Sequence, residues 1–493
     1  MKHTILSIDQ GTTSTRSIIF NENGNIINSF QKESRLLFPK NGWVEHNPNE
    51  IILHTIQTAS AGISETNDKV DTIGITNQRE TTLIWDKKTG KPVCNAIGWE
   101  DIRTSEYCTF LESKDFTSLI KNSTGLNINP YFSATKIRWI LDSIPDGQNK
   151  AENGDLCFGT VDTWIIYNLT KNKLHITDVT NASRTMLLNI HTLKWDREIL
   201  RIFNIPLQLL PNVLPSSYNF GVTDPKIFGY EIPITGIAGD QHASMFGHAC
   251  FEKGMTKCTY GTGAFILTNE GNDPLKLKNY KLLNTIGFQL KQKTFYASEG
   301  SVFSTGSAIQ WIKDGIKLIK NVSDTNLISE DTKDNGGLYF VPAFNGLGSP
   351  HWKTNAEGII TGIKRTTTKY HLIRAALEST AFQIKDVLQA SITSSNSNLP
   401  IKVDGGQTKN SFLMQFQADI LDRTIKVAKT TETTALGVAF IAGLKIGTWN
   451  SKDEIKSIIK SKSVFEPKMK SSERDSLYSQ WCEAIQKSSL TVK

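Results

Sequence analysis

The sequence predicts an α/β protein made of two similarly built domains. Its 493 residues are too many for a single hydrophobic core, and strand-like and helix-like stretches alternate along the chain. A strand–turn–strand pattern at residues 4–24 also recurs at 255–271. We therefore expect an N-terminal domain over 1–250 and a C-terminal domain over 251–493, the second ending in a helical tail.

The first half opens with three predicted strands. Residues 4–9 (TILSID) and 15–20 (TRSIIF) have the composition of buried strands, and an Asn-Gly turn in 21–27 leads into a third strand. The stretch 4–31 therefore predicts a meander of hairpins. The other elements expected in this half are a helix at 48–65, a strand at 71–76, a strand and helix at 154–170, a strand at 232–239 and a helix beginning at Asp240.

The second half opens with a similar hairpin. Residues 255–271 (MTKCTYGTGAFILTNEG) predict a strand, a Gly-Thr-Gly turn and a second strand. The stretch from Ser451 onward mixes lysines with acidic residues, which favours a solvated helical face. The remaining expected elements are a strand at 336–344, a long helix at 368–393, a strand, Gly-Gly turn and helix at 401–421, and a buried small-residue helix at 433–447.

Composition argues against several classes of protein. The net charge of +7 is scattered, without an arginine-rich stripe, so no nucleic-acid partner is expected. The six cysteines form no CxxC pair and the nine histidines no metal-binding spacing, which favours reduced thiols in a cytoplasmic protein over disulfides or zinc. No apolar run has the length of a membrane span or signal peptide, so no membrane insertion is expected.

The turn after the first strand, in SIDQGTTSTR (7–16), has the composition of a phosphate site. Such a turn needs backbone N–H groups that can point at oxygen and a glycine that lets the ligand approach. Gly11 and the hydroxyls at 12–15 meet this need, and Asp9 can hold the magnesium that accompanies nucleotide phosphates. The alternative is a tight hairpin whose hydroxyls bond their own turn. This stretch alone favours neither.

Two further glycine turns favour a nucleotide site. YGTG (260–263) ends another strand, and DGGQTKN (404–410) joins a strand to a helix. Two hairpins and a strand–Gly-Gly–helix turn in this order are how actin-like ATPases hold nucleotide. The chain has no P-loop, no GxGxxG and no protein-kinase motif. We therefore expect two actin-like (ribonuclease H-like) ATPase domains with a nucleotide and substrate cleft between them.

Longer blocks resemble those of a known family. The chain resembles the FGGY carbohydrate kinases essentially end to end and, within them, the members that phosphorylate glycerol. NQRE matters most for the substrate, because xylulose-type relatives carry a different block there. The blocks, in family order, are IDQGTTSTRSIIF, GWVEHNP, GITNQRETT, NPYFSATKIRW, GIAGDQHASMFG, YGTGAF, VDGGQTKNSFLMQFQADIL and TTALGVAFIAGL.

This resemblance implies a magnesium-dependent transfer of phosphate from ATP to glycerol. The product is sn-glycerol 3-phosphate, the role is glycerol catabolism or uptake, and the expected assembly is a homo-oligomer, a dimer or tetramer. Two alternatives stay open: a kinase for another small polyol or ketose, such as dihydroxyacetone or a pentulose, and an ATP-binding sensor on the same fold. A kinase must exclude water, so we expect the two domains to close about a hinge.

On the acceptor side, the resemblance implies that Asp240 is the general base and that Arg79 and Glu80 bind the glycerol hydroxyls. An Arg–Glu pair supplies fixed donors and acceptors, and leaving them unpaired penalises ligands that lack hydroxyls. The alternatives are a helix N-cap for Asp240 and a surface ion pair for Arg79 with Glu80. The other pocket residues that the resemblance implies are Trp99, Tyr131, Gln241 and Phe265. For the three aromatic residues among them, the alternative is core packing.

On the nucleotide side, the resemblance implies one cluster in each domain. Gly406 would let the backbone approach adenine and ribose; for Gly406 and Gly306 the alternative is a turn or packing glycine. Asp9, acting through water, and Asp240 are the expected magnesium-side carboxylates. The first-domain cluster is Thr12, Thr13, Ser14 and Arg16, and the second-domain cluster is Thr262, Gly263, Gly306, Gln310, Gly406 and Asn410.

The chain also departs from the family pattern. Glu231 stands where members inhibited by fructose 1,6-bisphosphate place an arginine, and the stretch around Lys226 lacks the phosphorylatable histidine of other members. Neither form of regulation is therefore expected. Lys353 and Glu357 replace an aspartate and an arginine, either as a charge-swapped pair or as two independent surface changes.

Overall fold

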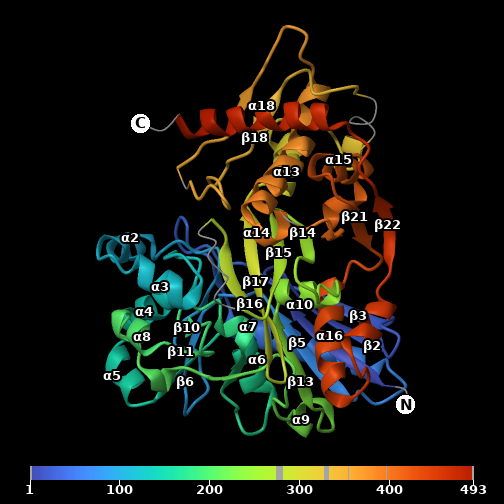
Figure 1. Cartoon of the computed structure of the whole chain (residues 1–493). Coiled ribbons are helices and arrows are strands. Elements are labelled where there is room, and N and C mark those ends of the chain that lie inside the picture. Colours follow the sequence, from blue (N-terminus) through green and yellow to red (C-terminus); the bar gives the residue numbers. More distant parts are fainter. Residues whose placement is uncertain (1–2, 274–280, 327–331, 354, 396, 491–493) are drawn as a thin grey trace.

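A computed structural model describes residues 3–273, 281–326, 332–353, 355–395 and 397–490 (Figure 1). The first domain is built on a five-stranded sheet of order β13-β5-β1-β2-β3. The predicted meander is confirmed, because β1, β2 and β3 pair antiparallel, and β5 and β13 then add in parallel beside β1. The bounds are β1 Thr4–Gln10, β2 Ser14–Asn21, β3 Ile26–Glu33, β5 Thr72–Asn77 and β13 Ile234–Gly239.

The second sheet has seven strands, in the order β16-β17-β15-β14-β20-β21-β22. Five of them, β17-β15-β14-β20-β21, repeat the order and directions of the first sheet, with an antiparallel hairpin beside parallel strands. This repeat confirms the prediction of two similarly built α/β domains. The bounds are β14 Thr256–Tyr260, β15 Ala264–Gly271, β16 Leu283–Leu290, β17 Lys293–Val302, β20 Ile401–Gly405, β21 Ile425–Ala428 and β22 Ser461–Phe465.

Two helices cross between the sheets. Helix α10 (Asp240–Gly247) follows β13, and α16 (Thr433–Ile446) follows β21, so they begin at equivalent points of the two domains. Their backbones touch: a Cβ added to Gly437 would overlap the carbonyl oxygen of Ala243, and one added to Gly247 would overlap that of Thr433.

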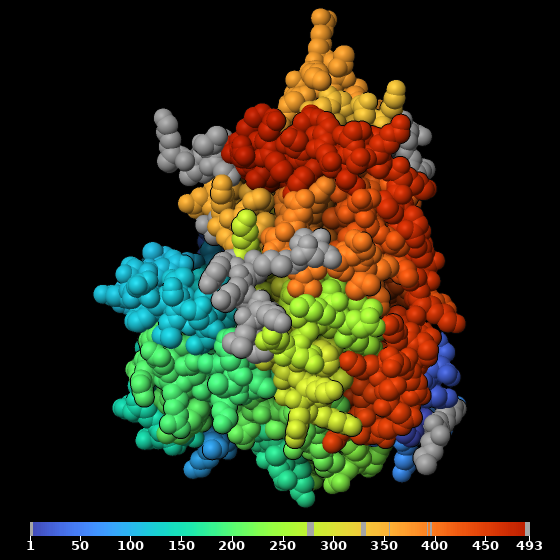
Figure 2. Space-filling model, viewed as in Figure 1, coloured from blue at the N-terminus to red at the C-terminus, as the bar shows by residue number. Residues whose placement is uncertain are grey.

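Helix α16 also packs on β1, β5 and β13, so a helix from the second half of the chain covers the first sheet (Figure 1). In the space-filling view, the orange-red stretch that contains α16 lies beside the blue N-terminal part of the chain, whereas the dark red C-terminal helix lies at the top (Figure 2). The domain boundary at 250 stays a prediction, and α16 reaches across it.

Outer helices and small strands complete the first domain. Helix α1 (Pro48–Ser64) covers the β1–β2–β3 meander, and it begins as its sequence predicts, with the Asn47 side chain accepting from Asn49 N and proline in the first turn. The other elements are β4 Glu45–His46, β6 Leu83–Asp86, β7 Ala96–Ile97, α2 Ser105–Ser113, α3 Thr117–Thr124, α4 Ser133–Ser143, α5 Gly147–Glu152, β8 Leu156–Gly159, α6 Val161–Leu169, β9 Ile176–Asp178, α7 Val179–Ala182, β10 Leu188–Asn189, β11 Lys194–Trp195, α8 Arg197–Ile202, η1 Leu207–Leu209, β12 Asn212–Leu214 and α9 Pro225–Phe228.

The second domain differs from the expectation in its tail. Helices α17 (Lys452–Ile458) and α18 (Ser471–Leu490) form there, but β22 lies between them and pairs with β21 as an edge strand bearing a lysine, a common way to protect a sheet edge. Across the described residues, none of the helices combines the length and apolar character needed to span a bilayer. The other elements are α11 Gly306–Gln310, the π-helical η3 Trp311–Gly315, β18 Tyr339–Val341, β19 Ile359–Thr361, α13 Lys369–Ala390, α14 Ile392–Ser395, η4 Gly406–Lys409 and α15 Ser411–Leu421.

Candidate active site

Arg79 and Glu80 lie in a tight turn directly after β5. The hydroxyls of Thr82 and Ser133 each donate to the Glu80 carbonyl oxygen at 3.0 Å. These bonds help to hold Glu80 at a φ of 61°, a left-handed conformation that a non-glycine residue keeps only where its surroundings enforce it. Both side chains are buried, with residue exposures of 3% and 1%, so they do not form the surface ion pair considered as the alternative.

Two residues that the sequence analysis missed complete a buried ionic cluster around this turn. Arg79 donates to Glu299 on β17, from Nη1 to Oε2 at 2.5 Å and from Nη2 to Oε1 at 3.3 Å. Arg184 donates from Nη2 to Glu299 Oε1 at 3.0 Å and from Nε to Glu80 Oε1 at 2.6 Å. We call Arg79, Glu80, Arg184 and Glu299 the buried quartet. It joins the two domains, because only Glu299 comes from the second.

Burial and charge act against each other in the quartet. Burial alone would raise the pKa of Glu299, but Arg184 and Arg79 outweigh it and hold that pKa below the usual value. Burial raises the pKa of Glu80, and the same two arginines offset this only in part. Glu299 is therefore the firmly ionised partner that both guanidinium groups share.

Asp240 is the first residue of α10 and lies beside this cluster. Its Oδ1 is 3.1 Å from Arg79 Nε and accepts from Gln241 N at 2.6 Å. The N-cap position belongs to Gly239, so the capping role considered for Asp240 is not observed. The Asp240 side chain is 31% exposed, whereas that of Arg79 is 2% exposed. Asp240 thus presents a reachable carboxylate with a cation behind it.

Three predicted pocket aromatics come together next to the quartet. The ring centroids of Trp99 and Tyr131 are 5.6 Å apart and those of Trp99 and Phe265 are 6.4 Å apart, both edge to face. Tyr131 Oη lies 3.5 Å from Arg79 Nη2. All three are only partly buried, although Tyr131 also packs against a hydrophobic core of the first domain. Phe265 lies on β15, so this group of aromatic side chains comes from both domains.

Gln241, the remaining predicted pocket residue, is oriented by a hydrogen bond from a buried lysine. Its side-chain oxygen accepts a hydrogen bond from the Nζ of Lys257, which is buried on β14. This contact orients the Gln241 amide, and it is another residue pair that no sequence pattern indicated.

The first-domain hairpin between β1 and β2 is closed by a bond from Gly11 N to Ser14 O at 2.9 Å. Thr12 Oγ1 accepts from Trp99 Nε1 at 3.0 Å, and Thr13 is exposed. Arg16 forms an ion pair with Glu432, the N-cap residue of α16. An incoming phosphate would therefore compete with Glu432 for the guanidinium of Arg16.

The two second-domain glycine turns and the start of α11 meet at one carbonyl oxygen. Gly261 O accepts from Gly306 N at 3.2 Å, from Gln407 Nε2 at 3.0 Å and from Thr305 Oγ1 at 3.2 Å. The predicted cluster of Thr262, Gly263, Gly306 and Gly406 is thus brought together. For Gly306 the packing alternative also holds, because an added Cβ would lie 2.5 Å from Gly261 O.

The adjacent glycines 405 and 406 differ in whether the protein has room for a side chain. Gly405 has a φ of +95°, and an added Cβ would overlap the Tyr260 backbone. A Cβ on Gly406 meets no atom within 4 Å. The fold therefore requires Gly405, while only a ligand would require Gly406.

Gln310 and Asn410 have partners within the second domain. Asn410 caps α15, accepting from Leu413 N at 2.8 Å, and its Nδ2 donates to Thr325 Oγ1 at 3.1 Å. Gln310 Nε2 donates to Asp314. Their nucleotide roles stay predictions.

Asp9 is the second-to-last residue of β1, and the pKa of its carboxyl group is raised. Burial raises its pKa to about 7; Arg16 acts to lower it, and the charges of Asp240 and Glu432 raise it further. Because the charges of Asp9 and Asp240 repel each other, a cation bound between them would be stabilised by both. Among the described residues no three His, Cys, Asp or Glu side chains form a metal-binding group, but nucleotide-bound Mg²⁺ needs only one or two carboxylates.

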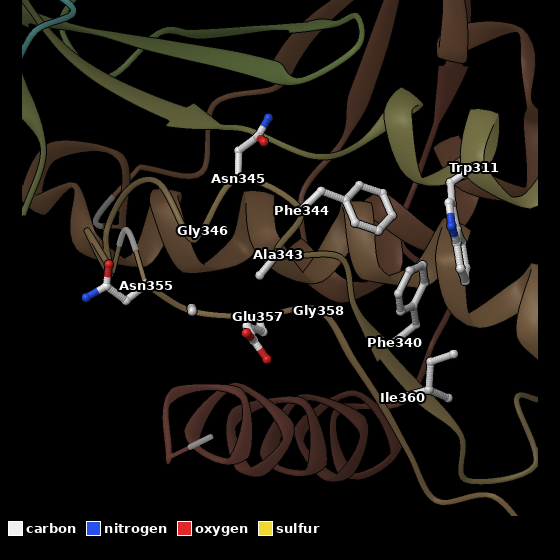
Figure 3. A pocket seen from close by; sticks show the side chains of 11 residues that line it. Trp311, Phe340, Ala343, Phe344, Asn345, Gly346, Asn355, Glu357, Gly358 and Ile360 are labelled. Atoms are coloured by element: carbon white, nitrogen blue, oxygen red, sulfur yellow. The ribbon is translucent and has the colours of Figure 1, made fainter. Parts of the chain in front are cut away.

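A surface pocket of about 700 Å³ lies apart from these residues (Figure 3). Its aromatic lining is Trp311, Phe340 and Phe344, and it adjoins the predicted nucleotide residues only where Trp311 follows Gln310. Glu357 also lines it. No ion pair joins Glu357 to Lys353 in the part of the chain that the structure describes, so the charge-swapped pair is not formed.

Two family models together match most of the chain. The N-terminal domain model of the FGGY family of carbohydrate kinases matches residues 4–247, and the C-terminal domain model matches residues 256–446. The chain therefore belongs to the FGGY family of carbohydrate kinases.

Within this family, the chain is similar over its full length to proteins named glycerol kinase. The chain is 51% identical to "Glycerol kinase 2" of Thermotoga maritima, covering 98% of each chain, and 50% identical to "Glycerol kinase" of Petrotoga mobilis, covering 99% of this chain and 98% of the relative. The solved structure of Plasmodium falciparum glycerol kinase with ADP has 38% identity and a TM-score of 0.94 over 99% of both chains. A xylulose kinase from Lactobacillus acidophilus, at 23% identity with a TM-score of 0.91 and 99% coverage of both chains, shows the fold alone.

Proposed function

We propose that this chain transfers the terminal phosphoryl group of ATP to glycerol, giving ADP and sn-glycerol 3-phosphate. One observation carries the proposal: the carboxylate of Asp240 lies 3.1 Å from Arg79 Nε, beside Glu80 and a half-buried aromatic wall. A buried Arg–Glu pair offers fixed donors and acceptors to hydroxyls, and the aromatic wall covers a carbon chain. The printed names of relatives about half identical to this chain support glycerol as the acceptor.

The reaction needs one proton to leave the acceptor. Asp240 takes the proton of the attacking hydroxyl while that oxygen forms a bond to the γ-phosphorus and the bond from phosphorus to the ADP oxygen breaks. Arg79 holds the Asp240 carboxylate in place through the contact at its Nε. A general base of this kind contributes about 10²–10⁴-fold to the rate.

Magnesium fits the residues on the phosphate side. Asp9 and Asp240 are the carboxylates that would hold it, since the charge of Asp240 already raises the pKa of Asp9. When bound, Mg²⁺ neutralises the charge that develops on the phosphate oxygens. The hydroxyls of Thr13 and Ser14 lie on the hairpin beside Asp9 and supply neutral donors.

A coupled ADP-release assay tests this function. Purified protein with ATP and Mg²⁺ is given glycerol, dihydroxyacetone, xylulose or no acceptor. We expect release that requires glycerol and falls about 10²–10⁴-fold in Asp240→Asn. The matched control is Asp196→Asn, which alters the N-cap carboxylate of α8 away from the site.

The same assay separates the rival functions. Turnover with dihydroxyacetone or xylulose but not glycerol would assign another acceptor. Release without any acceptor that survives in Asp240→Asn would instead favour an ATP-binding sensor, because such a protein needs no base for an alcohol.

We further propose a cytoplasmic homo-oligomer, a dimer or a tetramer. All six cysteines are free, as is usual in a reducing compartment, and the family resemblance supports self-association. Sedimentation at several protein concentrations tests the oligomer; a monomer throughout would contradict it.

A further inference from the structure

Glu299 reaches the acceptor site from the opposite domain. It lies on β17, between Leu267 of β15 and Leu283 of β16 in the register of the second sheet, so its backbone is fixed on both sides. Its side chain has an exposure of 0%. From this rigid position it accepts hydrogen bonds from Arg79 and Arg184, both of the first domain.

Arg184 is as fully buried as Glu299, with an exposure of 0%. Its guanidinium carbon lies 5.6 Å from the ring centroid of Tyr131 and 5.2 Å from that of Phe132. Its Nε donates a hydrogen bond to Glu80, and its Nη2 donates one to Glu299. Arg184 therefore sets the Glu80 carboxylate in the way that Glu299 sets the Arg79 guanidinium.

The charges of the buried quartet balance, two positive and two negative. A neutral polyol gains little from net charge, so its recognition depends on where donors and acceptors point. A guanidinium held by a carboxylate through two nitrogens has a fixed plane. The contact of Arg79 Nε with Asp240 is ionic and lacks the alignment of a hydrogen bond, so the Glu299 contact is what fixes the Arg79 fork.

We propose that Glu299 and Arg184 are positioning residues for the acceptor: they orient Arg79 and Glu80 toward its hydroxyls and make acceptor recognition depend on contact between the domains. This inference rests on the proposed function, because it names what holds the acceptor-binding pair. Neither residue touches the acceptor. Their effect is expected in acceptor affinity, with the nucleotide site left intact.

The test compares Glu299→Gln with wild type in steady-state kinetics and in calorimetric titration of glycerol without nucleotide. The amide nitrogen cannot accept from a guanidinium, so one arm of the contact is lost. We expect the KM and Kd for glycerol to rise by about tenfold or more, with the KM for ATP within about twofold of wild type. Glu299→Asp and Arg184→Lys keep the charges, and the rise should be smaller in both.

Glu378→Gln is the matched control. Glu378 is also buried in the second domain, where it accepts from Arg374 Nε at 2.7 Å and from Asn335 Nδ2 at 2.8 Å, but it has no contact with the quartet. A merely structural role for Glu299 would make both variants alike, with a lowered Tm and both KM values unchanged. That result, or an equal rise of both KM values in Glu299→Gln, would overturn the proposal.

Two outcomes keep this proposal distinct from the proposed function. If wild type uses another acceptor, the function fails and the same comparison is made with that acceptor. If Glu299→Gln does not fold, Glu299→Asp and Arg184→Lys decide: unchanged KM values for the acceptor in both would overturn the inference.

Discussion

Trp99 donates a hydrogen bond from its indole Nε1 to Thr12 Oγ1 at 3.0 Å. This contact joins the aromatic wall of the acceptor pocket to the hairpin that carries the predicted phosphate-binding hydroxyls. We call the acceptor-binding aromatic wall and the phosphate-binding hairpin the two half-sites. They are thus linked within the first domain itself.

Trp99→Phe should weaken both half-sites slightly. The ring remains, but the bond to Thr12 is lost, at a cost of about 0.5–1.5 kcal/mol or about 2–10-fold in kcat/KM. Kinetics with glycerol and ATP varied in turn measure this. Trp195→Phe, which loses an indole bond to Pro211 O elsewhere in the first domain, is the control and should stay at wild-type kcat/KM. Equal losses in the two variants would speak against the link.

Gly406→Ala should raise the KM for ATP without changing the Tm. The added methyl meets no protein atom, so only bound nucleotide can oppose it. Gly405→Ala should instead lower the Tm, because its φ is +95° and its Cβ overlaps the Tyr260 backbone. Thermal unfolding and ATP kinetics on both variants check this. An unchanged KM in Gly406→Ala would exclude close approach of the nucleotide there.

Asp9→Asn should stabilise the ligand-free protein most at alkaline pH. The folded-state pKa of Asp9 is raised to about 7 from 3.8. The folded state therefore binds the proton more tightly than the unfolded state, and wild-type stability falls as pH rises from about 4 to about 7. Asparagine does not ionise, so the variant does not lose this stability as the pH rises. Urea unfolding of both proteins at about pH 4.5 and about pH 8 should show the larger gain at the higher pH. Equal gains at both pH values would contradict the raised pKa.

Gly437→Ala should destabilise the crossing of α10 and α16. The new methyl overlaps the Ala243 carbonyl and forces the helices apart, a strain of about 1–3 kcal/mol or more. Gly447→Ala, at the end of the same helix, meets open space and carries only the cost of its positive φ, about 1–2 kcal/mol. Denaturant unfolding compares the two, and a smaller effect at Gly437 would be the unexpected result.

Domain closure should make the protein more compact when both substrates bind. Small-angle scattering with ADP and glycerol should give a smaller radius of gyration than the ligand-free protein, because a kinase must keep water from the phosphoryl group. Superimposable profiles would argue against a hinge.

Local patterns predicted the central hairpins and several helices of both domains, but not β16, β17, β22 or the helices α2 to α5. The meander of β1, β2 and β3 follows from alternating apolar runs and an Asn-Gly turn, and the glycine turns of both domains stand where strands end. These signals lie within a few residues of one another. The FGGY resemblance then supplied the roles expected of residues such as Asp240.

The buried quartet could be predicted only in half. Arg79 and Glu80 are adjacent and follow a strand, but Glu299 and Arg184 meet them only through tertiary packing. A lone acid in the small-residue strand FYASEGSV was the one available signal for Glu299, and nothing in NASRTMLL distinguishes Arg184. Long-range ion pairs leave no periodicity behind them. The same holds for α16, whose apolar composition predicted burial but not which sheet it covers.

The placement of α16 has a consequence for how the protein is made. The strands of the first sheet leave the ribosome early, yet the helix that covers β1, β5 and β13 is not synthesised until residue 446. A nascent chain of 250 residues would therefore expose an apolar sheet face, a surface that chaperones recognise and that aggregates when left bare. A gene cut at that point should yield an insoluble fragment, while supplying residues 251–493 as a separate chain should recover it.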